Sequence, residues 1–244
     1  MASRVFVLAA LAVAAGWGCS SSNVPTAPVV MTPEPSPGPM PIPQAPVAAV
    51  PQTAHYVVVF DATWSASSQP VDFPDTAHFS GLVGGTHGPA VRFWTAGALA
   101  TEGIRRMAER GSKSPLDQEV NDAIAAGTAE FLLSGPNLAS SPLSTSMELD
   151  ISQTFPLVTL VSMIAPSPDW FVGVDSLPLF HDGQWVDELR VDLHGYDAGT
   201  DSGTTYTSAD RATAPRQPVT RVGYPLAPSG PAPPLGSFTF RRTR

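Results

Sequence analysis

Cysteine is almost absent from this 244-residue chain, in which Cys19 is the only one. A single cysteine cannot close a disulfide within the chain, and no paired-cysteine or H-E-x-x-H spacing indicates a zinc site. Positive charge is also scarce, with 13 Lys and Arg against 21 Asp and Glu. The resulting formal net charge of −8 argues against nucleic-acid binding, which needs a basic face.

The N-terminus indicates export. Arg4 precedes the apolar run 5–15, which is too short to span a bilayer as a helix and is typical of a signal peptide over residues 1–18. The segment ending at Cys19 resembles a bacterial lipoprotein signal, although Gly16 stands where leucine is usual. This resemblance implies a lipid-carrying Cys19 and anchoring in the bacterial cell envelope, at the outer membrane or cell surface. The alternative is an ordinary signal peptide and a secreted protein with a free thiol.

The 27 prolines cluster towards the two ends of the chain. Residues 19–54 are rich in Pro, Ala, Val, Ser and Thr and cannot bury enough apolar surface to fold. Such a segment prefers extended polyproline II, at about 3.1 Å per residue, so we predict a stalk. With 43% apolar and only 14% charged residues overall, the chain also contains a globular part, which we place at residues 55–244.

Residues 55–244 read as an all-β domain, an antiparallel β-sandwich with two short accessory helices. Short runs of β-branched and aromatic residues separated by turn residues are typical of such a domain. The expected strands are 56–60, 91–94, 129–133, 147–151, 157–164, 171–174, 185–193 and 237–241. The helices are expected between Thr101 and Gly111 and between Ser114 and Gly127, with the threonine and serine as N-caps and the glycines as stops.

Two acidic turns bracket the run 170–196, and an antiparallel pair within it would bring them to one end. Asp169 lies in the first turn, and Asp197 and Asp201 lie in the second, where glycines let the chain curl back. At about 5 Å and an effective dielectric near 20, two carboxylates repel by roughly 3 kcal/mol, and a cation removes that cost. Hard oxygen ligands favour Ca²⁺ over zinc. The alternative is that Asp197 and Asp201 are turn residues that accept hydrogen bonds from local amides.

Three segments resemble the spondin N-domain, the module of F-spondin and mindin. They are HFSGLVGGTHGPAVRFWTAGALATEGIRRMAERG (78–111), SMIAPSPDWFVGV (162–174) and DLHGYDAGTDSGTTYTS (192–208). The resemblance implies a calcium ion on an antiparallel β-sandwich, with Asp169, Asp197 and Asp201 as ligands. Animal members carry cysteines where this chain has Phe180 and His181, so packing must hold the loop near Asp182.

The expected function is a calcium-binding adhesion or interaction module, with a protein or glycan of the cell surface or matrix as partner. A structural envelope or matrix protein without a specific ligand is one alternative. A secreted hydrolase is the other, because residues 200–205 imitate protease signatures. No second aspartyl loop and no serine–histidine–aspartate context supports it, so we predict a non-enzyme. Of five isolated histidines, only His194, beside the acidic turn, is a candidate for function.

Overall fold

The computed structural model describes residues 49–244. The signal peptide, Cys19 and the stalk up to residue 48 lie outside the described residues. Within residues 49–244, no helix is long and apolar enough to cross a membrane. The first strand, β1 (Thr53–Ala62), begins two residues before the domain start expected at His55.

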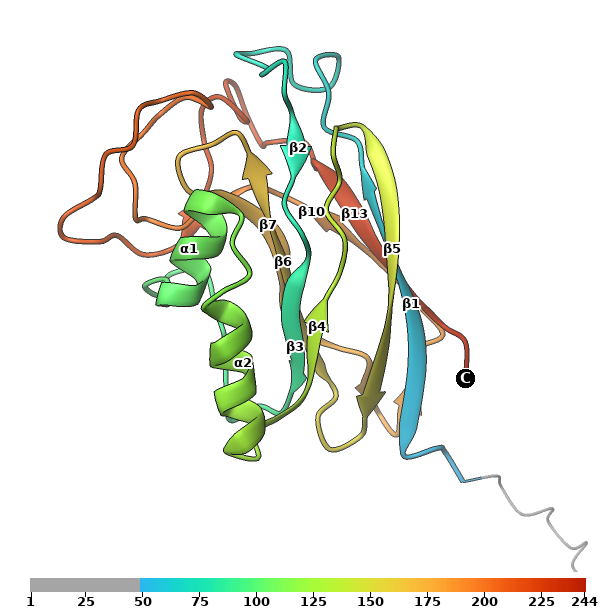
Figure 1. The fold of residues 1–244 in the computed structure, drawn as a ribbon. Coiled ribbons are helices and arrows are strands. Elements are labelled where there is room, and N and C mark those ends of the chain that lie inside the picture. The colour runs from blue at the N-terminus through green and yellow to red at the C-terminus, as the bar shows by residue number, and fades with distance from the viewer. Residues whose placement is uncertain (1–48) are drawn as a thin grey trace, which may run out of the picture. The chain divides into compact units, whose positions relative to one another are not determined.

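Two antiparallel sheets form the domain, which confirms the predicted β-sandwich (Figure 1). One sheet has the order β10-β13-β1-β5, and the strands that join β1 in it are β5 (Leu143–Ser152), β10 (Glu188–Leu193) and β13 (Gly236–Arg242). The other has the order β12-β11-β7-β6-β3-β4, with β2 paired to β6. Its strands are β2 (His78–Phe79), β3 (Val83–His87), β4 (Ala129–Ser134), β6 (Leu157–Ala165), β7 (Trp170–Pro178), β11 (Tyr196–Asp197) and β12 (Thr220–Arg221).

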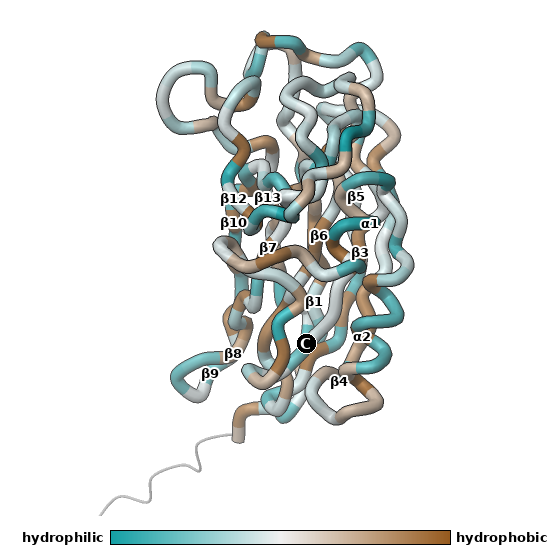
Figure 2. Tube along the Cα trace, turned by 90° about the vertical axis from the view of Figure 1, so that its left-hand side faces the viewer, coloured by the Kyte–Doolittle hydropathy of each residue, from teal (hydrophilic) through white to brown (hydrophobic). Residues whose placement is uncertain are grey.

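The main core lies between the sheets. Alternate residues of β1, among them Tyr56, Val58 and Phe60, are buried, as expected for a strand with one face on a core. The ring of Phe60 packs edge-on against Phe79 and Phe238, with centroids 5.0 and 5.1 Å away. Nearly every residue of β6 is buried because its second face is covered by helices, and apolar residues follow the inner strands in Figure 2.

Helices α1 (Glu102–Arg110) and α2 (Leu116–Ala125) cover the outer face of the larger sheet (Figure 1). The first has the predicted ends: the Thr101 hydroxyl accepts the Ile104 N–H, and Gly111 adopts a left-handed conformation. The predicted Ser114 cap of the second is wrong. Pro115 occupies the N-cap position without a side-chain hydrogen bond, because the serine lies in the preceding turn.

Two other sequence expectations differ from the structure. Residues 91–94 form no strand, because Phe93 and Trp94 pack their side chains under the helices while the backbone stays irregular. The run between the acidic turns does not fold back as one antiparallel pair, since β7 and β10 lie in different sheets. Between them β8 (Phe180–His181) and β9 (Gln184–Trp185) form a hairpin, held by packing of Phe180 on Trp185 at 4.9 Å.

Candidate functional site

Asp169 is positioned by a short turn between β6 and β7. The Ser167 hydroxyl accepts the Trp170 N–H at 3.0 Å and donates to the Ile164 carbonyl at 2.6 Å, which fixes this turn. The side chain of Asp169 is fully buried. The next two residues, Trp170 and Phe171, are buried as well, so they are core aromatics rather than exposed contacts.

The second acidic turn reaches Asp169 through β11, which pairs with the start of β7 at Asp197 and Trp170. Beyond β11, the loop donates three hydrogen bonds to one oxygen of the buried carboxylate. Asp169 Oδ2 accepts the N–H of Thr200 at 2.7 Å, the Thr200 hydroxyl at 3.1 Å and the N–H of Asp201 at 3.0 Å. The Asp169 carbonyl also accepts the N–H of Ala198 at 3.1 Å. The structure thus brings the two predicted turns together, by a different strand pairing from the one expected.

Asp197 and Asp201 both accept local amides, as the turn interpretation expected. Asp197 Oδ1 accepts the N–H of Gly199 at 2.7 Å. Asp201 Oδ1 accepts the N–H of Gly203 at 2.7 Å, and its Oδ2 accepts the N–H of Arg211 at 2.6 Å. These bonds hold the loop in shape, and they leave each accepting oxygen a second lone pair.

The electrostatics of this cluster are unfavourable for its charged form. Burial, followed by the negative charge of Asp197, raises the pKa of Asp169 to about 6, and the hydrogen bonds from the loop only partly oppose these effects. Burial also raises the pKa of Asp197. Asp169 Oδ1 is buried and has no hydrogen-bond partner among the described residues. A buried, unpaired carboxylate oxygen costs free energy that a bound cation would offset.

The three carboxylates are neighbours, but they do not form a ready-made metal cage. Within residues 49–244, no group of three or more His, Cys, Asp or Glu side chains is arranged to hold a metal ion. Asp169 and Asp197 fit a hard cation by charge and burial, whereas both oxygens of Asp201 already accept amides. Sequence reasoning missed Thr200 and Ser167, which hold Asp169 in place. Hydroxyl residues beside an aspartate were the available signal, and they are too common in turns to be specific.

By fold and site, this is a β-sandwich module whose loops converge at one end on a buried carboxylate. A family model described as Spondin_N matches residues 54–235. The chain belongs to the spondin N-domain family.

Curated relatives agree with this assignment. Human Spondin-2 is 36% identical over 195 residues, which cover 78% of this chain and 58% of that protein. Mouse Spondin-1 is 33% identical over 188 residues, which cover 72% of this chain and 23% of that protein. The chain therefore spans little more than half of the first relative and about a quarter of the second.

Proposed function

We propose that this protein is an exported β-sandwich module for adhesion or interaction at the cell surface, and that it carries Ca²⁺ at the acidic loop cluster of Asp169, Asp197 and Asp201. The observation that carries the proposal is Asp169 Oδ1, which is buried without a hydrogen-bond partner in residues 49–244 and lies near a second carboxylate, Asp197, whose pKa is also raised. A cation there would satisfy the oxygen and remove the repulsion between the two charges.

Calcium suits this donor set better than other metals. It takes six to eight oxygen ligands in flexible geometry, so loop carbonyls and water can complete a shell that the carboxylates begin. When bound, the ion supplies positive charge and fixes the loop. Asp169 and Asp197 contribute the unsatisfied negative charge, and Asp201 joins through lone pairs that its amide bonds leave free. Extracellular modules bind calcium at roughly 10⁻⁴ to 10⁻³ M, and we expect this range here.

An interaction role fits the family and the fold of residues 49–244. Loops at the end of a rigid sandwich are the usual place for binding residues, and the loop beyond Asp201 exposes residues 209–212. A protein or glycan of the cell surface or matrix is the proposed partner. Membrane attachment is proposed through lipid on Cys19 alone. The hydrolase alternative is disfavoured because Asp201 is engaged by amides and the Ser202 hydroxyl bonds to Arg211, not to a histidine.

Thermal unfolding of the protein in calcium and in chelator tests the proposal. A ligand that binds only the folded state raises stability by about 2.7 kcal/mol at a hundredfold excess over Kd. We expect such a rise for the wild type and for Asp182→Asn, which makes the same charge change at an exposed position in the β8–β9 hairpin, beyond the end of β7 that lies far from Asp169. Asp197→Asn keeps an oxygen for Gly199 and is expected to lose the rise. A wild type that unfolds at the same temperature in both solutions would refute the calcium site.

A further inference from the structure

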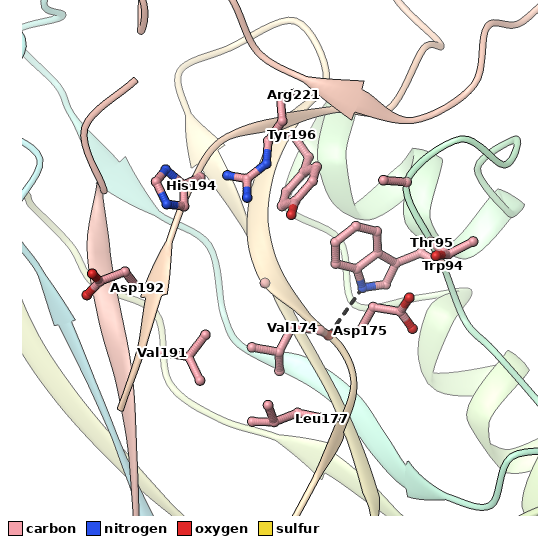
Figure 3. A pocket seen from close by; sticks show the side chains of 12 residues that line it. Trp94, Thr95, Val174, Asp175, Leu177, Val191, Asp192, His194, Tyr196 and Arg221 are labelled. Atoms are coloured by element: carbon pink, nitrogen blue, oxygen red, sulfur yellow. Dashed lines mark hydrogen bonds between the residues drawn. The ribbon is translucent and has the colours of Figure 1, made fainter. Parts of the chain in front are cut away.

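A cavity of about 310 Å³ lies between β7 and β10, and Figure 3 shows the side chains that line it. None of Asp169, Asp197 and Asp201 lines it, although Tyr196 of the lining precedes Asp197 in β11. Its lining comes from β7 of the larger sheet, from the edge strand β10 of the smaller one, and from β11 and β12. We call it the Arg221 cavity. Its volume is at the lower end of the range for small-molecule sites. A second cavity of about 430 Å³ adjoins it, because both are lined by His194 and Arg221.

The apolar part of the lining is held by packing and by one hydrogen bond. Val174, Leu177 and Val191 form one side of the cavity in Figure 3. Trp94 lies beside them, and its indole N–H donates to the Val174 carbonyl at 3.3 Å. The Trp94 ring also packs edge-on against Tyr196, with centroids 4.8 Å apart. A ligand would therefore meet a preformed apolar surface.

The uncompensated charge in the cavity is positive. The Arg221 guanidinium lies 4.5 Å from the centroid of the Tyr196 ring, and no carboxylate of residues 49–244 forms an ion pair with it. The two acidic residues of the lining already have arginine partners: Asp175 pairs with Arg92 at 3.0 Å and Asp192 with Arg190 at 3.5 Å. An arginine held over a ring without a carboxylate is suited to bind an anionic group through two parallel hydrogen bonds.

Other polar groups of the lining favour a ligand that carries hydroxyl groups. The carboxylates of Asp175 and Asp192 can accept hydrogen bonds from hydroxyls, and Thr95 adds a hydroxyl of its own. Burial, and then the charge of Arg221, lower the pKa of His194, which favours its neutral form. The backbone of Ala232 already accepts a hydrogen bond from this ring, so the second ring nitrogen is left as an acceptor. A purely apolar acid would leave these acceptors unused and would meet their negative charge.

We propose that the Arg221 cavity binds an acidic sugar, a uronate, with its carboxylate on Arg221. Its hydroxyls bond to Asp175 and Asp192, and its apolar ring face lies over the aliphatic side chains. The adjoining cavity gives a longer acidic glycan room to continue. An acidic glycan would then be the partner of the proposed interaction module, and only this biological role rests on the proposed function. The proposed contacts with the sugar involve none of Asp169, Asp197 and Asp201.

Titration of the protein with D-galacturonate tests this proposal. Binding is monitored through the NMR signal of the Trp94 indole N–H. D-galactose and acetate are titrated in parallel, and all titrations are run in chelator so that the calcium result does not bear on them. We expect saturable binding of galacturonate and weaker binding of both comparison ligands. Equal binding of acetate would overturn the inference, because the cavity would then accept any carboxylate, including an acidic protein side chain. Equal binding of galactose, or no binding of galacturonate, would overturn it as well.

Two pairs of variants place the ligand. Arg221→Gln is expected to weaken galacturonate binding by about tenfold or more, the loss expected when a charge-assisted hydrogen bond is removed. Arg216→Gln changes an exposed arginine outside the lining and is expected to bind as the wild type does. Ala96→Phe fills the cavity from an exposed lining position without changing charge and is expected to abolish binding, whereas Ala98→Phe, also exposed, is not. If both variants of either pair lose galacturonate affinity to the same extent, the ligand does not bind in the Arg221 cavity.

Discussion

Replacing Asp169 by asparagine is expected to stabilise the calcium-free protein at pH 7. The substitution keeps an oxygen to accept the N–H groups of Thr200 and Asp201, and it removes the charge that burial and Asp197 make unfavourable. Most substitutions of a fully buried polar residue destabilise a protein, so the expected direction is itself a specific test.

The magnitude follows from the pKa of Asp169, which rises from 3.8 in the unfolded chain to about 6 in the folded one. Each pKa unit corresponds to 1.36 kcal/mol, so the ionised side chain destabilises the fold by roughly 3 kcal/mol at pH 7. For a domain of this size, 1 kcal/mol shifts the midpoint by about 2–4 °C. We therefore expect Asp169→Asn to unfold on the order of 6–12 °C above the wild type in chelator.

The pH dependence of stability independently tests the predicted direction of the effect of Asp169→Asn. An acidic group whose pKa is higher in the folded state than in the unfolded state destabilises the fold when it is ionised. For Asp169 this destabilisation is complete above about pH 6 and disappears as the pH falls towards 3.8. The wild type in chelator is expected to gain stability between pH 7.5 and pH 5 relative to Asp169→Asn, which lacks the titrating group. At pH 7.5, adding calcium is expected to reduce the stability advantage of Asp169→Asn over the wild type, or to reverse it, because only the wild type is expected to bind calcium. A chelated variant less stable than the wild type at pH 7.5 would refute the reasoning.

Three further substitutions are measured by urea denaturation in chelator. Asp201→Ala removes the acceptor of two loop amides and is expected to cost about 3 kcal/mol, opposite in sign to the effect at Asp169; an unchanged midpoint would show that these bonds contribute nothing. Gly199→Ala is expected to cost about 2 kcal/mol, because φ is +73° and the added Cβ would lie 2.0 Å from the Gln217 carbonyl oxygen; a neutral result would mean that the loop moves freely. Phe60→Ala is expected to cost about 3–5 kcal/mol through the cavity left in the main core, and a loss below 1 kcal/mol would contradict its packing.

The features predicted best from the sequence depend on local chemistry. Thr101 and Gly111 delimit α1 as expected, because a hydroxyl cap and a left-handed glycine act within one helical turn. Most of the expected strands were also confirmed, since runs such as 157–164 are rich in apolar and β-branched residues. The expected strand 185–193 is divided into β9 and β10. Ser114 failed as a cap because the same residue type also favours the turn before a helix, and sequence alone does not separate these two uses.

What the sequence did not predict depends on distant parts of the chain. The pairing of β11 with β7 brings the acidic turns together, and it is set by the assignment of β10 to the other sheet, against β13 at the C-terminus. His194 was singled out for its place beside the acidic turn, but the structure places it in the Arg221 cavity. Arg221 itself lies in a proline-rich stretch that carries no functional signal in the sequence.

Most of the bonds that hold the second acidic turn run between carboxylates and main-chain N–H groups. Among the exposed side chains of this loop, that of Arg211 donates to the Ser202 hydroxyl. The exposed side chains of residues 204, 207, 209, 210 and 212 take no part in these bonds. Their identity can therefore change while the anchor of the loop remains. Because the loop is fixed mainly through its main chain, exposed side chains at its tip can be substituted without loss of the loop conformation. Such substitutions would change which partners this end of the sandwich can bind.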